Sequence, residues 1–268
     1  MRRSTRPRAL TPGATLGLGI GVLWFSLLVL IPLSAVIVEA SGGGWETYRS
    51  ALTNPQTLNA LKLTVGVSVL TTALNMVMGT VIAWVLVRDR FWGKRVLDLL
   101  IDIPFAMPTI VAGLVLLSLY GSQGPLGTEV ENTRKAVFLA IAFVTLPFIV
   151  RTVQPVLEEM ETDVEDAAAS LGASRFTIVR RVVLPTLVPA IFAGAALSFA
   201  RGISEYGSLV LLSGNLPNRT EVTSYRMASL LEGGNRPAAA ALATIMLIVA
   251  LLAIVVLDVT QRRLARRG

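Results

Sequence analysis

The sequence contains no cysteine and no histidine among its 268 residues. The lack of cysteine excludes disulfides, thiol nucleophiles and thiolate metal sites, and the lack of histidine excludes imidazole ligands and Ser-His relays. The phosphate-binding pattern G-x-x-x-x-G-K-[ST] is also missing from the sequence, so the chain has no P-loop for ATP. We therefore expect no metal and no cofactor in this chain, and we expect any energy source to be a partner or an ion gradient.

Charge is scarce as well. Charged residues make up 15% of the chain and apolar residues 53%, whereas about a quarter of a typical soluble domain is charged. The apolar residues gather in six segments, each long enough to cross the hydrocarbon core as a helix. These segments are about Leu16–Val38, Leu61–Val87, Leu97–Tyr120, Ala136–Val156, Leu187–Leu212 and Ala238–Leu257. They predict an all-α integral membrane protein with about six transmembrane helices.

The first apolar segment follows a basic stretch, MRRSTRPR, as the apolar region of a signal peptide does. Its apolar run is too long for an ordinary signal peptide, and no convincing small-x-small cleavage site follows it. We interpret it as a retained helix, with a cleaved signal peptide as the alternative. The expected organisation is a basic tail at 1–15, a transmembrane domain at 16–257 and a second basic tail at 258–268.

The chain is basic, with 24 Lys and Arg residues and a formal net charge of +7. Sixteen of these residues form four groups of four. One group precedes the first apolar segment and one follows the last. The other two lie in or beside the links after the second and fourth segments. Six crossings place all four groups on one side of the membrane, which is the positive-inside pattern. We therefore expect a multi-pass protein of the cytoplasmic (inner) membrane, surrounded by lipid, with both termini cytoplasmic. The basic excess is explained by this orientation, so we expect no nucleic-acid partner.

One long polar link, residues 157–186, interrupts the apolar segments. Asp163 is a good helix N-cap, and Glu165 and Asp166 would place negative charge in the first turn, where the helix dipole favours it. The run Ala167–Ala169 consists of the strongest helix former. These residues predict a short helix on the cytoplasmic side.

A turn and a second helix are expected after it. Gly172 suits the left-handed conformation just past a helix end, and Ser174 can cap the next helix. Arg180 and Arg181 lie near the last turns of that helix, and Pro185 either stops it or begins the next one. Because the alanine run leaves one side bare, the hairpin either rests on its own bundle or docks into a partner.

Aligned on its glycine, this link resembles the cytoplasmic signature loop of importer-type ABC transporter permeases: E-A-A, three residues, G, nine residues, I-x-L-P. The corresponding residues here are Asp166-Ala167-Ala168, Gly172 and Val182-Val183-Leu184-Pro185. Asp166 replaces the glutamate of the pattern and Val182 the isoleucine, while the neighbouring Glu165 is an alternative for the acidic role. In that family the loop is a coupling helix that inserts into a cleft of a cytoplasmic ATPase. The resemblance thus implies that the chain attaches to an ATPase through Glu165, Asp166, Ala167, Ala168, Gly172, Val182, Leu184 and Pro185.

Four further stretches resemble the sulfate/thiosulfate importer permeases, and the resemblance covers about residues 20–260. They are DLLIDIPFAMPTIVAGLVLLSLYG (98–121), FARGISEYGS (199–208), SGNLPNRTEVTS (213–224) and RPAAAALA (236–243). Molybdate/tungstate permeases share the fold and a similar acidic-aromatic-glycine run, and are the nearest alternative. The resemblance implies a type I ABC importer permease without catalytic activity of its own.

The same resemblance implies a set of partners. Two cytoplasmic ABC ATPase subunits would bind ATP and Mg, and a second homologous permease would help to enclose the path. An extracytoplasmic sulfate-binding protein would deliver its cargo over the outer links Glu39–Leu58 and Ser213–Pro237.

Arg201 and Glu205 lie near the middle of the fifth apolar segment, four residues apart. A charge at the bilayer centre costs about 2.5–3.5 kcal/mol on insertion scales, so such residues face a cavity or each other. One interpretation is a mutual ion pair, and the other is a segment that lines a translocation path for sulfate. The candidate path residues are Arg201, Ser204, Glu205, Tyr206, Gly207 and Ser208.

Asp98 and Asp102 form a second pair at helical spacing. They lie close to Lys94 and Arg95 in the sequence. We expect a structural ion pair at the cytoplasmic edge, formed with these neighbouring cations.

Pro104 and Pro108 lie near the start of the third apolar segment. Proline lacks the backbone donor and clashes with the preceding turn of a helix. We therefore expect the third transmembrane helix to be kinked or broken at its start.

Two other classes of protein agree less well with the sequence. An ion-coupled secondary transporter predicts inverted repeats and more protonatable groups at the midplane, and neither is visible in the sequence. A membrane-embedded enzyme needs a catalytic constellation, and without His or Cys we find no carboxylate or Ser/Lys arrangement with suitable spacing.

Overall fold

The computed structural model describes residues 12–265, which are almost entirely helical and contain no strand. In chain order the helices are α1 (Pro12–Phe25), η1 (Ser26–Leu30), α2 (Ile31–Gly42), α3 (Gly44–Thr53), α4 (Pro55–Arg88), α5 (Lys94–Ala106), α6 (Thr109–Tyr120), α7 (Arg134–Glu159), α8 (Thr162–Ser170), α9 (Arg175–Ile178), η2 (Val179–Val183), α10 (Leu184–Ile203), α11 (Gly207–Leu212), α12 (Thr223–Glu232) and α13 (Arg236–Ala265). Residues 1–11 and 266–268 lie outside this part, so most of the expected N-terminal tail and the end of the C-terminal tail are not described.

Five segments of the described chain are long and apolar enough to cross a membrane. They are Gly13–Gly42, Pro55–Arg88, Arg134–Glu159, Arg175–Ile203 and Arg236–Leu264. The bent pair α5 and α6 adds a sixth if it is counted as one span. This agrees with the six crossings expected from the sequence, although α5 and α6 together do not form a continuous helix.

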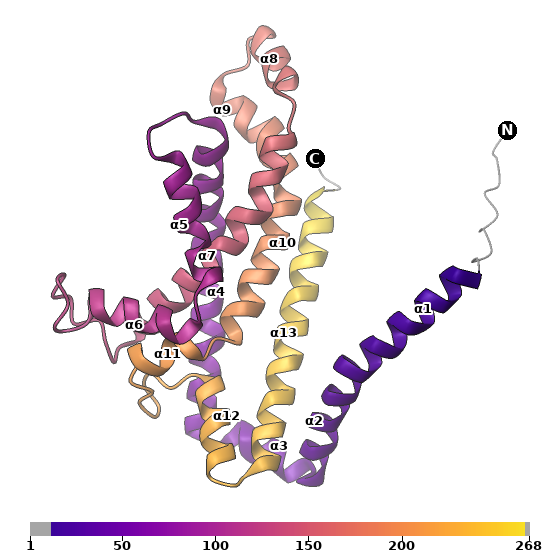
Figure 1. Ribbon diagram of the computed structural model, residues 1–268, viewed down its shortest axis with the longest axis vertical. Coiled ribbons are helices and arrows are strands. Elements are labelled where there is room, and N and C mark those ends of the chain that lie inside the picture. Colours follow the sequence, from indigo (N-terminus) through magenta and orange to yellow (C-terminus); the bar gives the residue numbers. More distant parts are fainter. Residues whose placement is uncertain (1–11, 266–268) are drawn as a thin grey trace.

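The core of the bundle consists of α4, α7 and α10, with α13 packed against α10 (Figure 1). Glycines allow the closest approaches. An added Cβ at Gly79 on α4 would lie 2.7 Å from Cβ of Ile149 on α7, and one at Gly194 on α10 would lie 3.0 Å from Cα of the same Ile149. Small residues at helix crossings let backbones approach in this way within membranes. Asn75 adds a polar link, because its Nδ2 donates to Thr145 Oγ1 at 2.9 Å.

The two ends of the bundle differ. In Figure 1 the α8–α9 hairpin lies at the top, and α3 and α12 lie at the bottom. We call these the hairpin end and the far end. The C-terminal end of α13 lies toward the hairpin end, as does the start of α1.

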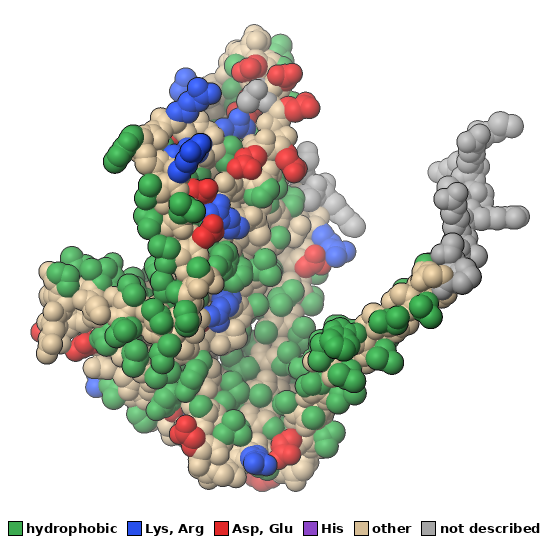
Figure 2. Space-filling view, viewed as in Figure 1, with side chains coloured by type: hydrophobic (Ala, Val, Ile, Leu, Met, Phe, Trp, Pro, Cys, Tyr) green, Lys and Arg blue, Asp and Glu red, His purple; other side chains and the backbone are tan. Residues whose placement is uncertain are grey.

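The first span is set apart from the core. Its α2 part packs against α13, whereas α1 points away from the bundle (Figure 1). Apolar side chains cover this helix, as Figure 2 shows, and large ones such as Leu16 and Trp24 are exposed. Such a surface is compatible with a helix that faces lipid or another apolar chain.

The third span is broken. Its two halves, α5 and α6, meet at an angle of 119°, so the expected break is confirmed, but a single helix over Leu97–Tyr120 is wrong. Pro104 lies inside α5, and Pro108 before α6 is extended, with ψ at 136°. Because neither proline can donate a backbone hydrogen bond, the helical ladder ends here, and α6 projects to the side of the bundle (Figure 1).

The fifth span also departs from a single helix over Leu187–Leu212. α10 ends at Ile203, and α11 begins at Gly207. Between them the chain leaves the helical conformation, and Tyr206 has φ −134° and ψ −55°. Arg201 therefore lies in the last turn of α10 and Glu205 in the break, rather than near the middle of one helix.

Candidate coupling hairpin and translocation site

The polar link forms the helix, turn and helix that its sequence predicts. Gly172 takes the left-handed conformation, with φ at +86°, and the amide of Ala173 donates to the carbonyl of Ala168 at 3.1 Å. Ser174 Oγ accepts from the amide of Thr177 at 3.3 Å, so it caps the second helix. These contacts close a short hairpin with a defined shape.

The start of the first helix differs in detail. α8 begins at Thr162 after Glu161, so Asp163 is its second residue and not its N-cap. The acidic residues of the first turn are Asp163 and Glu165, and Asp166 lies one position further on. The negative charge near the helix N-terminus is as expected, but the helix begins two residues earlier than expected, so the acidic residues lie further into it.

The second helix of the hairpin continues into the fifth span. α9 passes through the π-helical turn η2, which carries Arg180 and Arg181, directly into α10. Pro185 is the second residue of α10 and directly follows the π-helical turn, so it cannot donate a backbone hydrogen bond to the turn before it. The hairpin is thus joined to a transmembrane helix without a flexible link.

The hairpin has a held side and a free side. Glu165 Oε1 lies 2.5 Å from Nη2 of Arg88 at the end of α4, and both side chains are mostly buried. Ala168 packs against the core cluster near this contact, whereas Ala167 is exposed. Both interpretations of the alanine run therefore describe part of the geometry: one side rests on the bundle and the other is open.

The free side is apolar. Leu171 is 88% exposed and Phe176 is 72% exposed, and Val164 is also open to solvent. Among the sequence-predicted residues, Asp166, Leu184 and Pro185 are exposed and Val182 is half-buried. Exposed large apolar side chains grouped on a polar hairpin are typical of a protein–protein contact.

The Arg201–Glu205 pair forms within the chain. Arg201 Nη2 lies 2.7 Å from Glu205 Oε2, and the carboxylate is 1% exposed whereas the arginine is 29% exposed. The other oxygen, Oε1, accepts from the amide of Ser208 at 2.8 Å and from its hydroxyl at 2.9 Å. The buried glutamate therefore both neutralises Arg201 and supplies the missing acceptor at the start of α11.

Not all candidate path residues face the same way. Ser208 is fully buried, and its hydroxyl is used by Glu205. Ser204 and Tyr206 are exposed, and the Tyr206 ring stacks on Tyr225 of α12 with the centroids 6.3 Å apart. Arg201, Ser204 and Tyr206 thus form the accessible part of this group.

The two broken spans contact each other at their breaks. An added Cβ at Gly207 would lie 2.1 Å from Oγ1 of Thr109 at the start of α6, and one at Gly113 would lie 2.4 Å from the carbonyl oxygen of Ser208. Only glycine allows these approaches of α11 to α6. The break in the fifth span is therefore held by both Glu205 and the crossing with α6.

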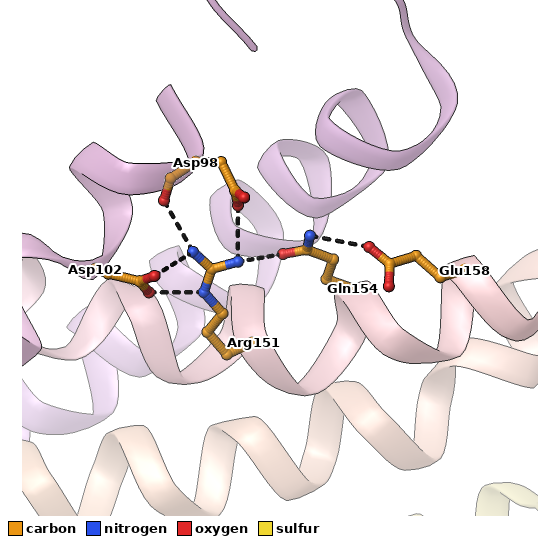
Figure 3. A network of polar contacts seen from close by, with 5 residues as sticks. All are labelled: Asp98, Asp102, Arg151, Gln154 and Glu158. Atoms are coloured by element: carbon orange, nitrogen blue, oxygen red, sulfur yellow. Dashed lines mark hydrogen bonds and ion pairs between the residues drawn. The ribbon is translucent and has the colours of Figure 1, made fainter. Parts of the chain in front are cut away.

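A second charged network joins α5 and α7 (Figure 3). Arg151 donates from Nε and Nη2 to the two oxygens of Asp102, and from Nη1 to Asp98, all at 2.7 Å. The expected partners Lys94 and Arg95 are therefore wrong. Arg151 is the partner because it projects from the neighbouring α7 between the two carboxylates, which are one helical turn apart on α5.

Two cations were missed as partners, Arg88 and Arg151. Each of these arginines belongs to one of the four basic groups that the positive-inside pattern explains. The sequence therefore gave no separate reason to expect an acidic partner for either of them. An arginine within or beside an apolar segment is the signal that could have marked them, because such residues usually have a buried partner. Over the described residues no group of three or more acidic side chains could hold a metal ion.

Residues 75–267 match the family of binding-protein-dependent transport system inner membrane components. The chain belongs to this family. It is also 42% identical over 267 residues to the sulfate transport system permease protein CysT of Salmonella typhimurium, with 97% of this chain and 96% of that protein covered. The CysT protein of Synechocystis is 38% identical over 248 residues, with 90% and 87% covered.

Chains of solved ABC transporters have the same fold as this chain. A chain of a bacterial alginate ABC transporter, solved with a periplasmic protein that holds an alginate pentasaccharide, aligns with a TM-score of 0.79, 16% identity and 94% coverage of both chains. A chain of the MetNI methionine ABC transporter in an inward-facing conformation aligns with a TM-score of 0.57 and 18% identity, covering 78% of this chain and 94% of that one. The chain is thus an all-α ABC importer permease, and it is the non-catalytic, membrane-embedded component of such a system.

Proposed function

We propose that this permease forms the translocation path for sulfate or thiosulfate in an ATP-driven importer. The observation that carries the proposal is the identity of about two residues in five, over nearly the whole chain, to sulfate transport system permeases. An importer permease works with an ATPase and a substrate-binding protein, and the hairpin has a free apolar side suited to a protein contact.

The arrangement of the complex is part of the proposal. Two cytoplasmic ATPase subunits bind ATP and Mg and receive the hairpin, and a second homologous permease completes the path. The hairpin end and both termini are cytoplasmic, and a sulfate-binding protein docks at the far end. Because η2 and α10 continue the hairpin without a break, movement of the ATPases is transmitted to the fifth span.

The test is uptake of labelled sulfate by the complex reconstituted in proteoliposomes with its binding protein. We expect uptake that requires ATP, and competition by unlabelled sulfate or thiosulfate but not by molybdate. Sulfate movement by this chain alone without ATP, or preference for molybdate, would contradict the proposal.

We further propose that Arg201, Ser204 and Tyr206 line the path. They are the accessible members of the group around the break, and the guanidinium of Arg201 with the hydroxyl donor of Tyr206 suits a tetrahedral dianion. Arg201→Gln should lower sulfate uptake while the ATPase subunits still co-purify. Arg262→Gln is the matched control, because this arginine is exposed on α13 in an i,i+4 pair with Asp258. Equal uptake by the two variants would remove Arg201 from the path.

A further inference from the structure

Two adjoining cavities lie toward the far end of the bundle, where α4 and α7 begin. The first has a volume of about 380 Å³ and is lined by Asn59, Lys62, Leu63, Gly66, Val67 and Arg134. The second, of about 480 Å³, is formed by the loop before α7 and by the loop after α11, and includes Arg134, Lys135 and Arg219. Arg134 lines both cavities, and we call the two together the basic recess.

The cations of this recess have no carboxylate partner. Within the described part of the chain, none of Lys62, Arg134, Lys135 and Arg219 forms a salt bridge. The arginines at the hairpin end that matter for packing, such as Arg88, are paired with acids. The second cavity has one acidic residue in its lining, Glu129, and the first has two cations and no acidic residue. The recess therefore carries excess positive charge.

Positive charge is unusual at this end of the molecule. Eight basic residues lie outside the four groups that orient the chain, and four of these eight line the recess. Lys and Arg are disfavoured in outer loops because they oppose the topology set by the inner ones. Orientation therefore does not explain these four residues.

The recess is a built structure rather than a loose surface. Nε of Arg134 donates to the carbonyl oxygen of Arg219 at 3.1 Å, which holds the guanidinium against the loop after α11. Asn59 Nδ2 donates to Asn218 Oδ1 at 3.0 Å and ties the same loop to α4. The Nη groups of Arg134 make no hydrogen bond within the described residues. They remain as donors, together with the ammonium group of Lys62.

The geometry points to an oxyanion-receiving site: we propose that Lys62 and Arg134 hold sulfate at the outer mouth, between its release by the binding protein and its entry into the path. This inference rests on the proposed sulfate import and specifies where it begins. A guanidinium and an ammonium match a tetrahedral dianion in charge and in hydrogen bonding. Because both cations are exposed, binding is weak, which suits a site that an ion must leave again.

The first experiment measures uptake by the reconstituted complex with sulfate-loaded binding protein. Lys62→Gln combined with Arg134→Gln should lower the maximal uptake rate by roughly tenfold, because focused charge raises the local anion concentration by that order. The binding-protein concentration for half-maximal uptake should stay unchanged. The charge-preserving pair Lys62→Arg and Arg134→Lys should keep most of the uptake, and Arg262→Gln, at an exposed arginine on α13, is the surface-charge control.

Two outcomes would overturn the proposal. Unchanged uptake in the Gln variant would show that the recess does not act on sulfate. A preserved maximal rate that requires more binding protein would show that the cations dock the acidic surface of that protein instead.

A second experiment does not depend on transport. Since the chain has no cysteine, Gly66→Cys introduces its only thiol into the first cavity, and an added Cβ there meets nothing within 4 Å. In the complex, an anionic methanethiosulfonate reagent should modify this thiol several-fold faster than its trimethylammonium counterpart. Labelling of the parent complex gives the background from partner chains.

Sulfate should slow the reaction of this thiol with the anionic reagent more than sodium chloride of equal ionic strength does. Both the rate preference and the protection should disappear when Lys62→Gln and Arg134→Gln are added. A preference that survives these substitutions, or protection equal to that of chloride, would overturn the site. If labelling shows both the rate preference and the protection by sulfate, but the parent complex imports no sulfate, the proposed function is wrong and the anion site is still supported.

Discussion

Arg151 on α7 holds the carboxylate of Asp102 on α5 in a two-pronged contact, with Nε and Nη2 each 2.7 Å from a different carboxylate oxygen. The pair joins the first half of a broken span to the core of the bundle (Figure 3). The Arg151 side chain is 28% accessible and the Asp102 side chain 47%, so the arginine is the more shielded partner of a partly exposed pair. We infer that this contact keeps α5 in place beside α7.

A double-mutant cycle tests this role. Arg151→Gln should lower the stability of the purified complex more than Asp102→Asn does, because it leaves both Asp98 and Asp102 without a partner. The double variant should be less destabilised than the sum of the single variants, by about 1 kcal/mol for a partly exposed network. Thermal unfolding in detergent provides the measurement, and strictly additive effects would show that the pair contributes nothing.

The two acidic residues of the hairpin should play different roles. Glu165 is bound to Arg88 within the chain, whereas Asp166 is exposed, so Asp166 is the carboxylate free to meet the ATPase. We predict that Asp166→Asn reduces ATPase attachment directly and leaves the stability of this chain unchanged. Glu165→Gln should lower thermal stability as well, since it frees the Arg88 charge.

Co-purification of the ATPase with the permease separates these effects. The Arg88→Gln variant serves as a control, because it should reproduce the loss of stability caused by Glu165→Gln. If Asp166→Asn retained the ATPase fully and Glu165→Gln did not, the assignment of the two carboxylates would have to be reversed.

Gly172 should be required for its backbone conformation and not for space. Its φ is +86°, and an added Cβ meets nothing within 4 Å. A left-handed conformation costs about 1–2 kcal/mol for most residues but less for Asn. Gly172→Ala should therefore loosen the hairpin and weaken ATPase attachment, while Gly172→Asn should retain more of it. Equal attachment by the two variants would indicate that the turn tolerates any conformation.

The crossing of α6 and α11 should be sensitive to a single methyl group. An added Cβ at Gly113 would lie 2.4 Å from the backbone oxygen of Ser208, and backbone cannot move aside as a flexible side chain can. Gly113→Ala should destabilise the complex by about 1–3 kcal/mol, which is typical of overpacking. Gly66→Ala is the matched control on α4, where the space is open, and it should not be destabilising. Thermal unfolding of both variants is the measurement. Unchanged stability of the Gly113→Ala variant would mean that α6 and α11 are less closely packed than described.

Most of the membrane-spanning architecture could be predicted from the sequence. Four of the six spans agree with the expected segments, because apolar length and composition are local properties. The break near Pro108 was also expected, since proline cannot continue a helical ladder. A complete break at Ser204–Tyr206 was not expected. Gly202 and Gly207 on either side of it allow a bend, and the buried bond of Glu205 to Ser208 starts a new helix.

The candidate sites divide in the same way. The hairpin and its glycine turn follow from the sequence, because caps, alanine runs and a left-handed glycine act within a few residues. The partners of the charged residues do not follow from it. Asp98 and Asp102 have cations nearby in the sequence, yet they bind Arg151, which lies about fifty residues further along the chain.

The sequence by itself therefore determined that this is a polytopic helical protein with a structured polar hairpin between two apolar segments. Only the tertiary structure decided that Arg88 pairs with Glu165, that the buried Ser208 binds the carboxylate of Glu205, and that Lys62 and Arg134 line one cavity. The physical reason is the range of the interactions. Helix propensity and hydrophobicity act between neighbours in the chain, whereas a charged side chain takes whichever partner the packing of distant helices brings within about 3 Å.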